Sequence, residues 1–97
     1  MSTKERYLLR RAIQEGERRK NLPPSEDPKR DYLAWRDYVE SAFDETVGPD
    51  HRFAIEFMAV NNAGVLDSIH SWEDQQQQAR ELIERDISLF QRLISQA

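Results

Sequence analysis

Cysteine is absent from this 97-residue chain, and histidine and glycine are scarce. Without cysteine the chain has no disulfide, no thiolate nucleophile and no zinc site built on cysteine ligands. Its three glycines, Gly16, Gly48 and Gly64, stand far apart, so no glycine-rich loop is available to hold a phosphate. The sequence therefore excludes the function classes that depend on these motifs.

The residue spacings typical of catalytic and metal sites are also missing. Neither His51 nor His70 has a nucleophile or a carboxylate at a recognisable motif spacing, and neither follows a glutamate by three positions, as four-helix carboxylate metal sites require. Adjacent carboxylates such as Asp44 and Glu45 point to different faces of a helix, so we interpret them as solvated charge. We expect a non-enzymatic chain with no cofactor and no metal, unless subunits assemble a site between them.

Long apolar runs are absent as well. No stretch approaches the about 18 to 20 apolar residues of a membrane-spanning helix. Met1 to Glu5 contain no apolar run like that of a signal peptide, so we expect a cytoplasmic protein without membrane contact. The mean hydropathy of -0.85 is low for a globular chain, and the argument for folding therefore comes from the periodic apolar positions.

Apolar residues recur at helical spacing in four segments. This pattern predicts an all-α fold, a small four-helix bundle-like domain that spans residues 1–97 as a single unit. We expect its helices over about residues 3–20, 28–47, 51–61 and 68–95.

Capping residues mark the ends of the first two helices. Ser2 and Glu5 have the spacing of a capping box, and Asp27 before Pro28 is typical of an N-cap followed by the first helical position. Gly48 is typical of a C-cap. The connector between these two helices contains adjacent prolines, which prevent the first helix from continuing.

The remaining turn and helix signals are less specific. Either Asp67 or Ser71 begins the last helix, and Gly64 is interpreted as a C-cap. Gly16, inside the first helix, is expected to permit close approach of another helix. The glutamine run over residues 75–78 is expected to face solvent.

Charge is divided unevenly along the chain. Residues 1–30 carry nine Lys or Arg against five Asp or Glu (net +4), and residues 31–97 carry five against thirteen (net -8). The basic end could contact nucleic acid or an acidic face of a neighbouring helix or subunit. The candidate nucleic-acid contacts are Arg6, Arg10, Arg11, Arg18, Arg19 and Lys20.

The apolar face of the last helix is broader than one neighbour in a small bundle requires. We therefore expect this helix, with part of the second, to present apolar side chains to a partner protein. The candidate partner-binding residues are Trp35, Phe43, Leu82, Leu89, Phe90 and Leu93.

Nine core and turn residues occur along the chain in an order that also includes a proline connector after the first predicted helix and a long helix at the end. These residues are Leu9, Ile13, Gly16, Trp35, Val39, Phe43, Gly48, Phe53 and Phe57. In this order the chain resembles the helical N-terminal segments that precede TIR-like and other effector domains in bacterial antiphage proteins. The resemblance covers most of the chain and implies a module for self-association or for docking a partner, with the chemistry carried by another domain.

The leading hypothesis is a protein–protein interaction module that self-associates or docks to an effector in a bacterial or phage defence-related system. One alternative is nucleic-acid binding through the basic first helix. Another is a small acidic inhibitor, whose residues 31–86 occupy the basic groove of a nucleic-acid-binding protein.

Overall fold

The computed structural model describes residues 1–60 and 63–96. Every regular element in these ranges is helical, and the expectation of an all-α, bundle-like fold is confirmed. The elements are α1 (Thr3–Lys20), α2 (Pro28–Thr46), α3 (Arg52–Ala59), the 3₁₀-helix η1 (Ala63–Ser68) and α4 (Trp72–Ser95). None of these helices is long and apolar enough to cross a membrane.

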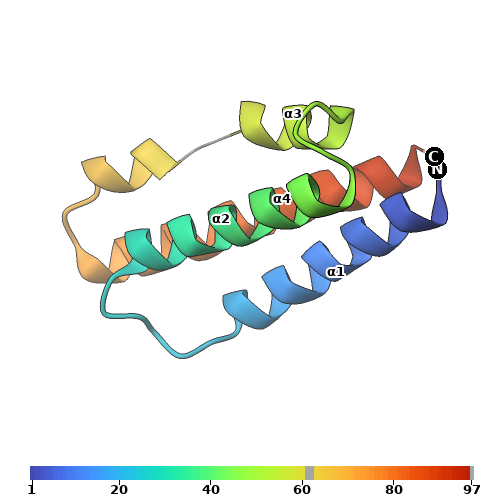
Figure 1. Ribbon diagram of the computed structural model, residues 1–97. Helices are drawn as coiled ribbons and strands as arrows, with labels where there is room; N and C mark the ends of the chain where they lie inside the picture. Colours follow the sequence, from blue (N-terminus) through green and yellow to red (C-terminus); the bar gives the residue numbers. More distant parts are fainter. Residues whose placement is uncertain (61–62, 97) are drawn as a thin grey trace.

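Three long helices form the body of the molecule (Figure 1). α2 and α4 run in the same direction, and α1 runs opposite to both. A direct link between two parallel helices must cross their full length, and here α3 and η1 make that crossing. α2 and α4 are the central elements, since each of them contacts all the others; α4, the longest helix, contacts α1, α2, α3 and η1.

The helix ends follow the capping signals at most positions. Ser2 and Glu5 form a complete capping box, and the Asp27 carboxylate accepts a hydrogen bond from the Arg30 backbone N–H. Ser71 is the N-cap of α4, so the alternative start at Asp67 is wrong. The physical reason is that residues 63–68 form the separate η1 turn before α4 begins.

Of three predicted helix ends, one agrees with the structure, one differs from it and one lies outside the described residues. Gly48 adopts φ +92° after α2, as expected of a C-cap, and its N–H donates to the Phe43 carbonyl. Gly64 does not adopt positive φ and lies inside η1, so its interpretation as a C-cap is wrong. The predicted end of the third helix at residue 61 lies outside the described residues.

The connector between α1 and α2 is held against α4 by three side chains. Trp72 Nε1 donates to the Ser25 carbonyl at 2.8 Å, and the Gln76 side-chain oxygen accepts from the Ser25 N–H at 3.1 Å. Arg80 donates to the Leu22 carbonyl at 3.3 Å. The glutamine run therefore does more than face solvent. Its Gln76 side chain holds the connector, which has no regular backbone hydrogen bonding of its own.

Gly16 lies where α1 crosses α2 and α4. A Cβ atom at this position would lie 2.9 Å from Ile87 Cγ1 and 3.0 Å from the Trp35 ring. Such distances are shorter than carbon–carbon van der Waals contact, so only glycine allows this approach. The expected role of Gly16 in close helix packing agrees with this geometry.

Gly16→Ala is expected to destabilise the fold, because overpacking costs about 1–3 kcal/mol and the gain in helix propensity is only about 1 kcal/mol. Urea unfolding followed by circular dichroism measures the difference. In an Ile87→Ala background the closest contact of the added methyl group is removed and only the contact with the Trp35 ring remains, so the same change should cost less. An equal loss in both backgrounds would contradict the steric explanation.

The start of α1 is joined to the start of α3 through a histidine. The His51 Nδ1 atom accepts the Phe53 N–H at 3.1 Å, so the proton of the neutral ring lies on Nε2, which donates to the Glu5 carboxylate at 2.8 Å. The Ser2 backbone N–H, the Ser2 hydroxyl and His51 together lower the pKa of Glu5 to about 2. This contact stabilises the fold only while Glu5 is ionised.

The lowered pKa of Glu5 predicts a pH-dependent contribution to stability. A carboxyl group with a lowered pKa makes its full contribution to the free energy of unfolding above its ordinary pKa, here 4.5. This contribution is lost as the pH falls towards about 2. Glu5→Gln should therefore destabilise the chain above about pH 4.5 and have little effect near pH 2, as measured by urea unfolding across this range. Glu26→Gln, on the connector, is the control. A Glu5→Gln effect of constant size at every pH would contradict this assignment.

Candidate functional site

The six apolar residues predicted to bind a partner lie in the core of the single chain. Their exposed fractions are between 0% and 5%. The prediction that they form a docking surface is therefore wrong for this structure. The residues are Trp35, Phe43, Leu82, Leu89, Phe90 and Leu93.

The central position of α4 explains this correction. A helix that packs against one neighbour needs one apolar stripe, but α4 is covered by α1, α2, α3 and η1. Phe90, for example, contacts rings from both α2 and α3, namely Phe43 at 5.9 Å and Phe57 at 5.5 Å between ring centroids. The broad apolar face is thus occupied by other segments of the same chain.

A polar network lies inside this core. The buried Asp86 carboxylate accepts hydrogen bonds from Trp35 Nε1 at 2.9 Å and from the Tyr32 hydroxyl at 3.2 Å. Arg36 Nη1 lies 3.6 Å from the same carboxylate, and Arg36 Nη2 donates to the Phe57 carbonyl at 3.0 Å. The network therefore joins α2, α3 and α4.

Burial is the main influence on the charge of this network. It raises the pKa of Asp86, and the Trp35, Arg36 and Tyr32 side chains oppose that rise. Arg36 Nε and Nη1 form no hydrogen bond within the described residues, and the guanidinium carbon lies 3.7 Å from the centre of the Phe57 ring. We interpret the network as structural, since both charged residues are almost fully buried, with exposed fractions of 2% for Arg36 and 1% for Asp86.

Sequence reasoning missed Asp86 because carboxylates were treated as solvated charge. One signal was present: Asp86 lies four residues after Leu82 and four before Phe90, which places it within the apolar stripe of α4. A charged residue inside an apolar stripe requires a partner. Its partner, Arg36, carried the same signal in α2, where it lies four residues after Tyr32 and three before Val39. The sequence could not show that these two residues, from different helices, pair with each other.

The six candidate nucleic-acid contacts fall into two groups. Three are engaged inside the chain: Arg18 and Arg19 form ion pairs with Glu15, and Lys20 pairs with Glu17 and Glu84. Of the others, Arg11 contacts the Tyr38 hydroxyl, and Arg6 and Arg10 form no ion pair within the described part of the chain. All of the second group, Arg6, Arg10 and Arg11, are exposed.

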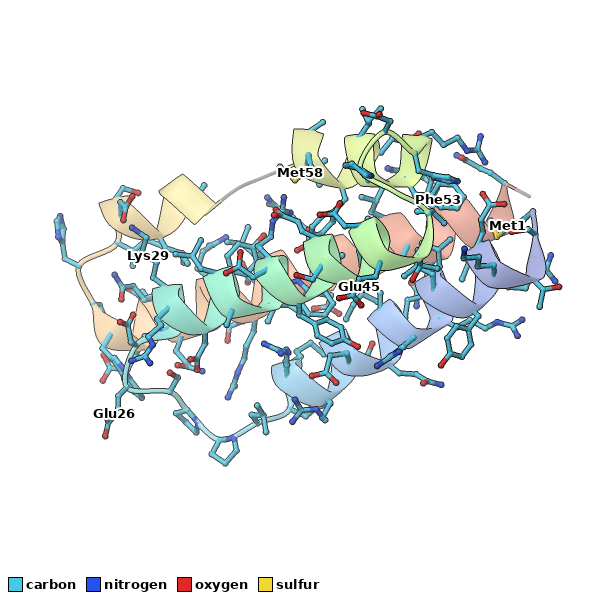
Figure 2. All side chains as sticks on the ribbon, viewed as in Figure 1. Met1, Glu26, Lys29, Glu45, Phe53 and Met58 are labelled. Carbon is cyan, nitrogen blue, oxygen red and sulfur yellow. The ribbon has the colours of Figure 1, made fainter. Side chains whose placement is uncertain are left out.

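Large apolar side chains are exposed on α3. This helix buries Phe53, Ala54 and Phe57 and turns Ile55 and Met58 to the surface, with exposed fractions of 57% and 51%. Ile55 and Met58 are three residues apart and therefore share one face of the helix. We call this pair the α3 ridge; Figure 2 labels Met58 at the end of α3.

A groove of about 280 Å³ lies between α2 and α3, and Met58 forms part of its edge. Its floor is apolar, and its α2 edge carries two carboxylates. This volume lies below the usual range of small-molecule pockets, so the groove suits the side chain of a partner better than a whole ligand. We call it the α2–α3 groove; its lining is Glu40, Phe43, Asp44, Pro49, Ala54, Phe57 and Met58.

The edge of the groove belongs to a row of carboxylates on α2, which we call the acidic row and define as Asp37, Glu40 and Asp44. These residues lie three or four positions apart and none of them forms an ion pair within residues 1–60 and 63–96. Like charges at this spacing destabilise a helix by a few tenths of a kcal/mol per pair. A cationic partner would remove this repulsion.

A second small cavity, of about 210 Å³, lies beside the connector. Its walls include the Tyr32 ring and Ile83, and arginines line its edge. Arg18 and Arg19 at this edge are already paired with Glu15, and Arg80 already donates to the connector. The arginines at this edge therefore already have partners within the chain.

The two histidines do not form a reactive site. His51 caps α3, and His70 is exposed just before α4. Within the described residues, no group of three or more His, Asp or Glu side chains has a geometry that could hold a metal ion.

No family model matches this sequence, and neither a curated protein nor a solved structure matches it. The function of the chain must therefore be inferred from its own surfaces.

Asp86→Ala is expected to lower the free energy of unfolding by about 3–5 kcal/mol, because it leaves the charge of Arg36 buried without its partner. The double variant Arg36→Met, Asp86→Leu removes both charges and should cost less than Asp86→Ala. Urea unfolding of the two variants measures this. If the double variant were the less stable one, the two charges would not act as a pair.

Proposed function

We propose that this chain is a non-enzymatic protein-binding module and that its contact surface is the α2–α3 groove together with the α3 ridge. The observation that carries this proposal is the position of an exposed apolar surface directly beside a row of unpaired carboxylates. Burying Ile55 and Met58 against a partner would contribute about 25 cal/mol for each Å² of apolar surface removed from water. The unbranched side chain of Met58 adapts readily to different partner shapes.

The chemistry of this surface defines the kind of partner. An apolar floor selects an apolar side chain, and the acidic row selects lysine or arginine beside it. A helix that carries both on one face meets these requirements, as in the general mode in which an amphipathic helix lies in an apolar groove. The proposed partner is therefore an amphipathic, basic helix of a protein.

The cellular role is a narrower proposal. The resemblance to helical segments that precede effector domains in antiphage proteins supports self-association or docking to an effector in a bacterial or phage defence-related system, in the cytoplasm. The neighbouring genes test this role, because an adjoining effector or nuclease gene would supply the partner.

The acidic row also supports the alternative of an inhibitor that occupies a basic nucleic-acid-binding groove. The two candidates differ in what they require of Met58. Binding by charge alone would not depend on this side chain, whereas a helix seated in the groove would contact it. Direct nucleic-acid binding has less support, because half of the candidate cations are paired inside the chain and the acidic row repels phosphate.

A peptide titration tests the proposal. The probe is a synthetic helix with leucines on one face flanked by lysines, and its control has glutamates in place of the lysines. With the full chain labelled with ¹⁵N, the lysine peptide should shift the amide signals of α2 and α3, and the glutamate peptide should not.

Met58→Asp should weaken binding of the lysine peptide about tenfold or more, since it removes a central apolar contact. Leu22→Asp is the matched control, because Leu22 is an exposed apolar residue on the connector. Equal binding of both peptides, or an unchanged affinity in Met58→Asp, would contradict the proposed surface. Binding that requires lysine but not Met58 would favour the inhibitor.

A further inference from the structure

A surface complementary to the acidic row exists on the same chain. The outer face of α1, which we define as Arg6, Tyr7 and Arg10, is exposed, and the Tyr7 side chain is 62% exposed. Neither arginine forms an ion pair within the described residues. Tyr7, which also contacts Arg11, lies beside these two arginines, and tyrosine and arginine are residue types that dominate binding energy at protein interfaces.

This outer face has the chemistry that the α2–α3 groove selects. The apolar floor of the groove suits an aromatic ring, and the volume of about 280 Å³ suits a single side chain. Arg6 and Arg10 would then lie beside the carboxylates of the acidic row. The arginines of the outer face of α1 and the carboxylates of the acidic row thus have opposite charge, and in both sets the residues lie three or four positions apart on a helix.

Within one chain the outer face of α1 does not reach the α2–α3 groove, because none of its three residues lines that groove. Tyr7 instead lines a separate groove between α1 and α2, which also contains Asp37. α1 packs against α2 and α4, and Figure 1 shows α1 and α3 on opposite sides of α2. The outer face of α1 also points away from the core, because the opposite face of this helix buries Leu8, Leu9 and Ala12. Contact with the groove therefore requires a second molecule.

We propose that the occupant of the α2–α3 groove is the outer face of α1 from a second copy of this chain, with Tyr7 in the groove and Arg6 and Arg10 on the acidic row. This inference rests on the proposed function, because it assigns a specific partner to the same surface. The contact joins two different patches, so it closes as a reciprocal dimer or a ring, or it continues as a chain of molecules. Because it depends on exposed ion pairs, it weakens as salt increases.

Sedimentation equilibrium of the full chain tests the inference. The unmodified chain should associate at concentrations up to about 1 mM in low salt, and association should weaken in high salt. Arg10→Glu and Asp44→Arg should each weaken association about tenfold or more, because each places like charges opposite one another. The double variant with both changes in one chain should restore association, since the charges are then exchanged rather than lost.

Two further variants distinguish the effect of net charge on association from the effect of losing the proposed contact. Arg85→Glu makes the same charge change on the exposed surface of α4 and should leave association unchanged. Tyr7→Ser removes the aromatic ring without changing charge and should weaken association. Circular dichroism confirms that each variant remains folded, as expected because all four changed positions are exposed.

A chain that stays monomeric at about 1 mM in low salt would overturn this inference. So would association that neither Arg10→Glu nor Asp44→Arg weakens, or that the double variant fails to restore. The peptide titration remains independent of these results. A monomeric chain that still binds the lysine peptide through Met58 would retain the proposed function with a different protein as partner.

Discussion

The buried carboxylate of Asp86 is the constraint on which the rest of the structure depends. A carboxylate can lie inside a protein core only if polar partners surround it. Here two hydrogen-bond donors and one cation surround it, and all three come from one face of α2. Tyr32, Trp35 and Arg36 therefore fix the rotation of α2 against α4. The same Arg36 donates to the Phe57 carbonyl of α3, so the position of the short helix follows from that of the carboxylate. We infer that this network contributes less to stability than to selecting one arrangement of helices.

The central role of α4 determines what remains for binding. In a chain of this length the core is small, and one long helix covered on several sides supplies more of it than any other element. Its apolar width is used internally, so the surface that remains for a partner is formed by the segments at the edge. α3 is the main such segment, because it packs on the core through one face only and carries Ile55 and Met58 on a face that lies in solvent. The proposed interaction surface is therefore a consequence of how the core is filled.

Much of the fold could be predicted from local signals. The capping box at Ser2 and Glu5, the N-cap at Asp27 and the C-cap at Gly48 act within a few residues of themselves, so the sequence alone locates these helix ends. The contact surface could not be predicted in this way. The apolar stripe of α4 has the same pattern whether it faces a partner or its own chain, and only the path of α3 and η1 over it distinguishes the two cases.

The sequence by itself determined the helical class, most of the helix ends and the close approach at Gly16, because helix periodicity, capping and the lack of a Cβ atom are local properties. Only the tertiary structure decided which apolar residues are buried, which cations are paired and which side chains surround Asp86. These outcomes depend on contacts between residues far apart in the chain, such as Trp35 with Asp86, and no local pattern specifies such a pairing. For the same reason, the exposed pair Ile55 and Met58 could be recognised only after the rest of the core was assembled.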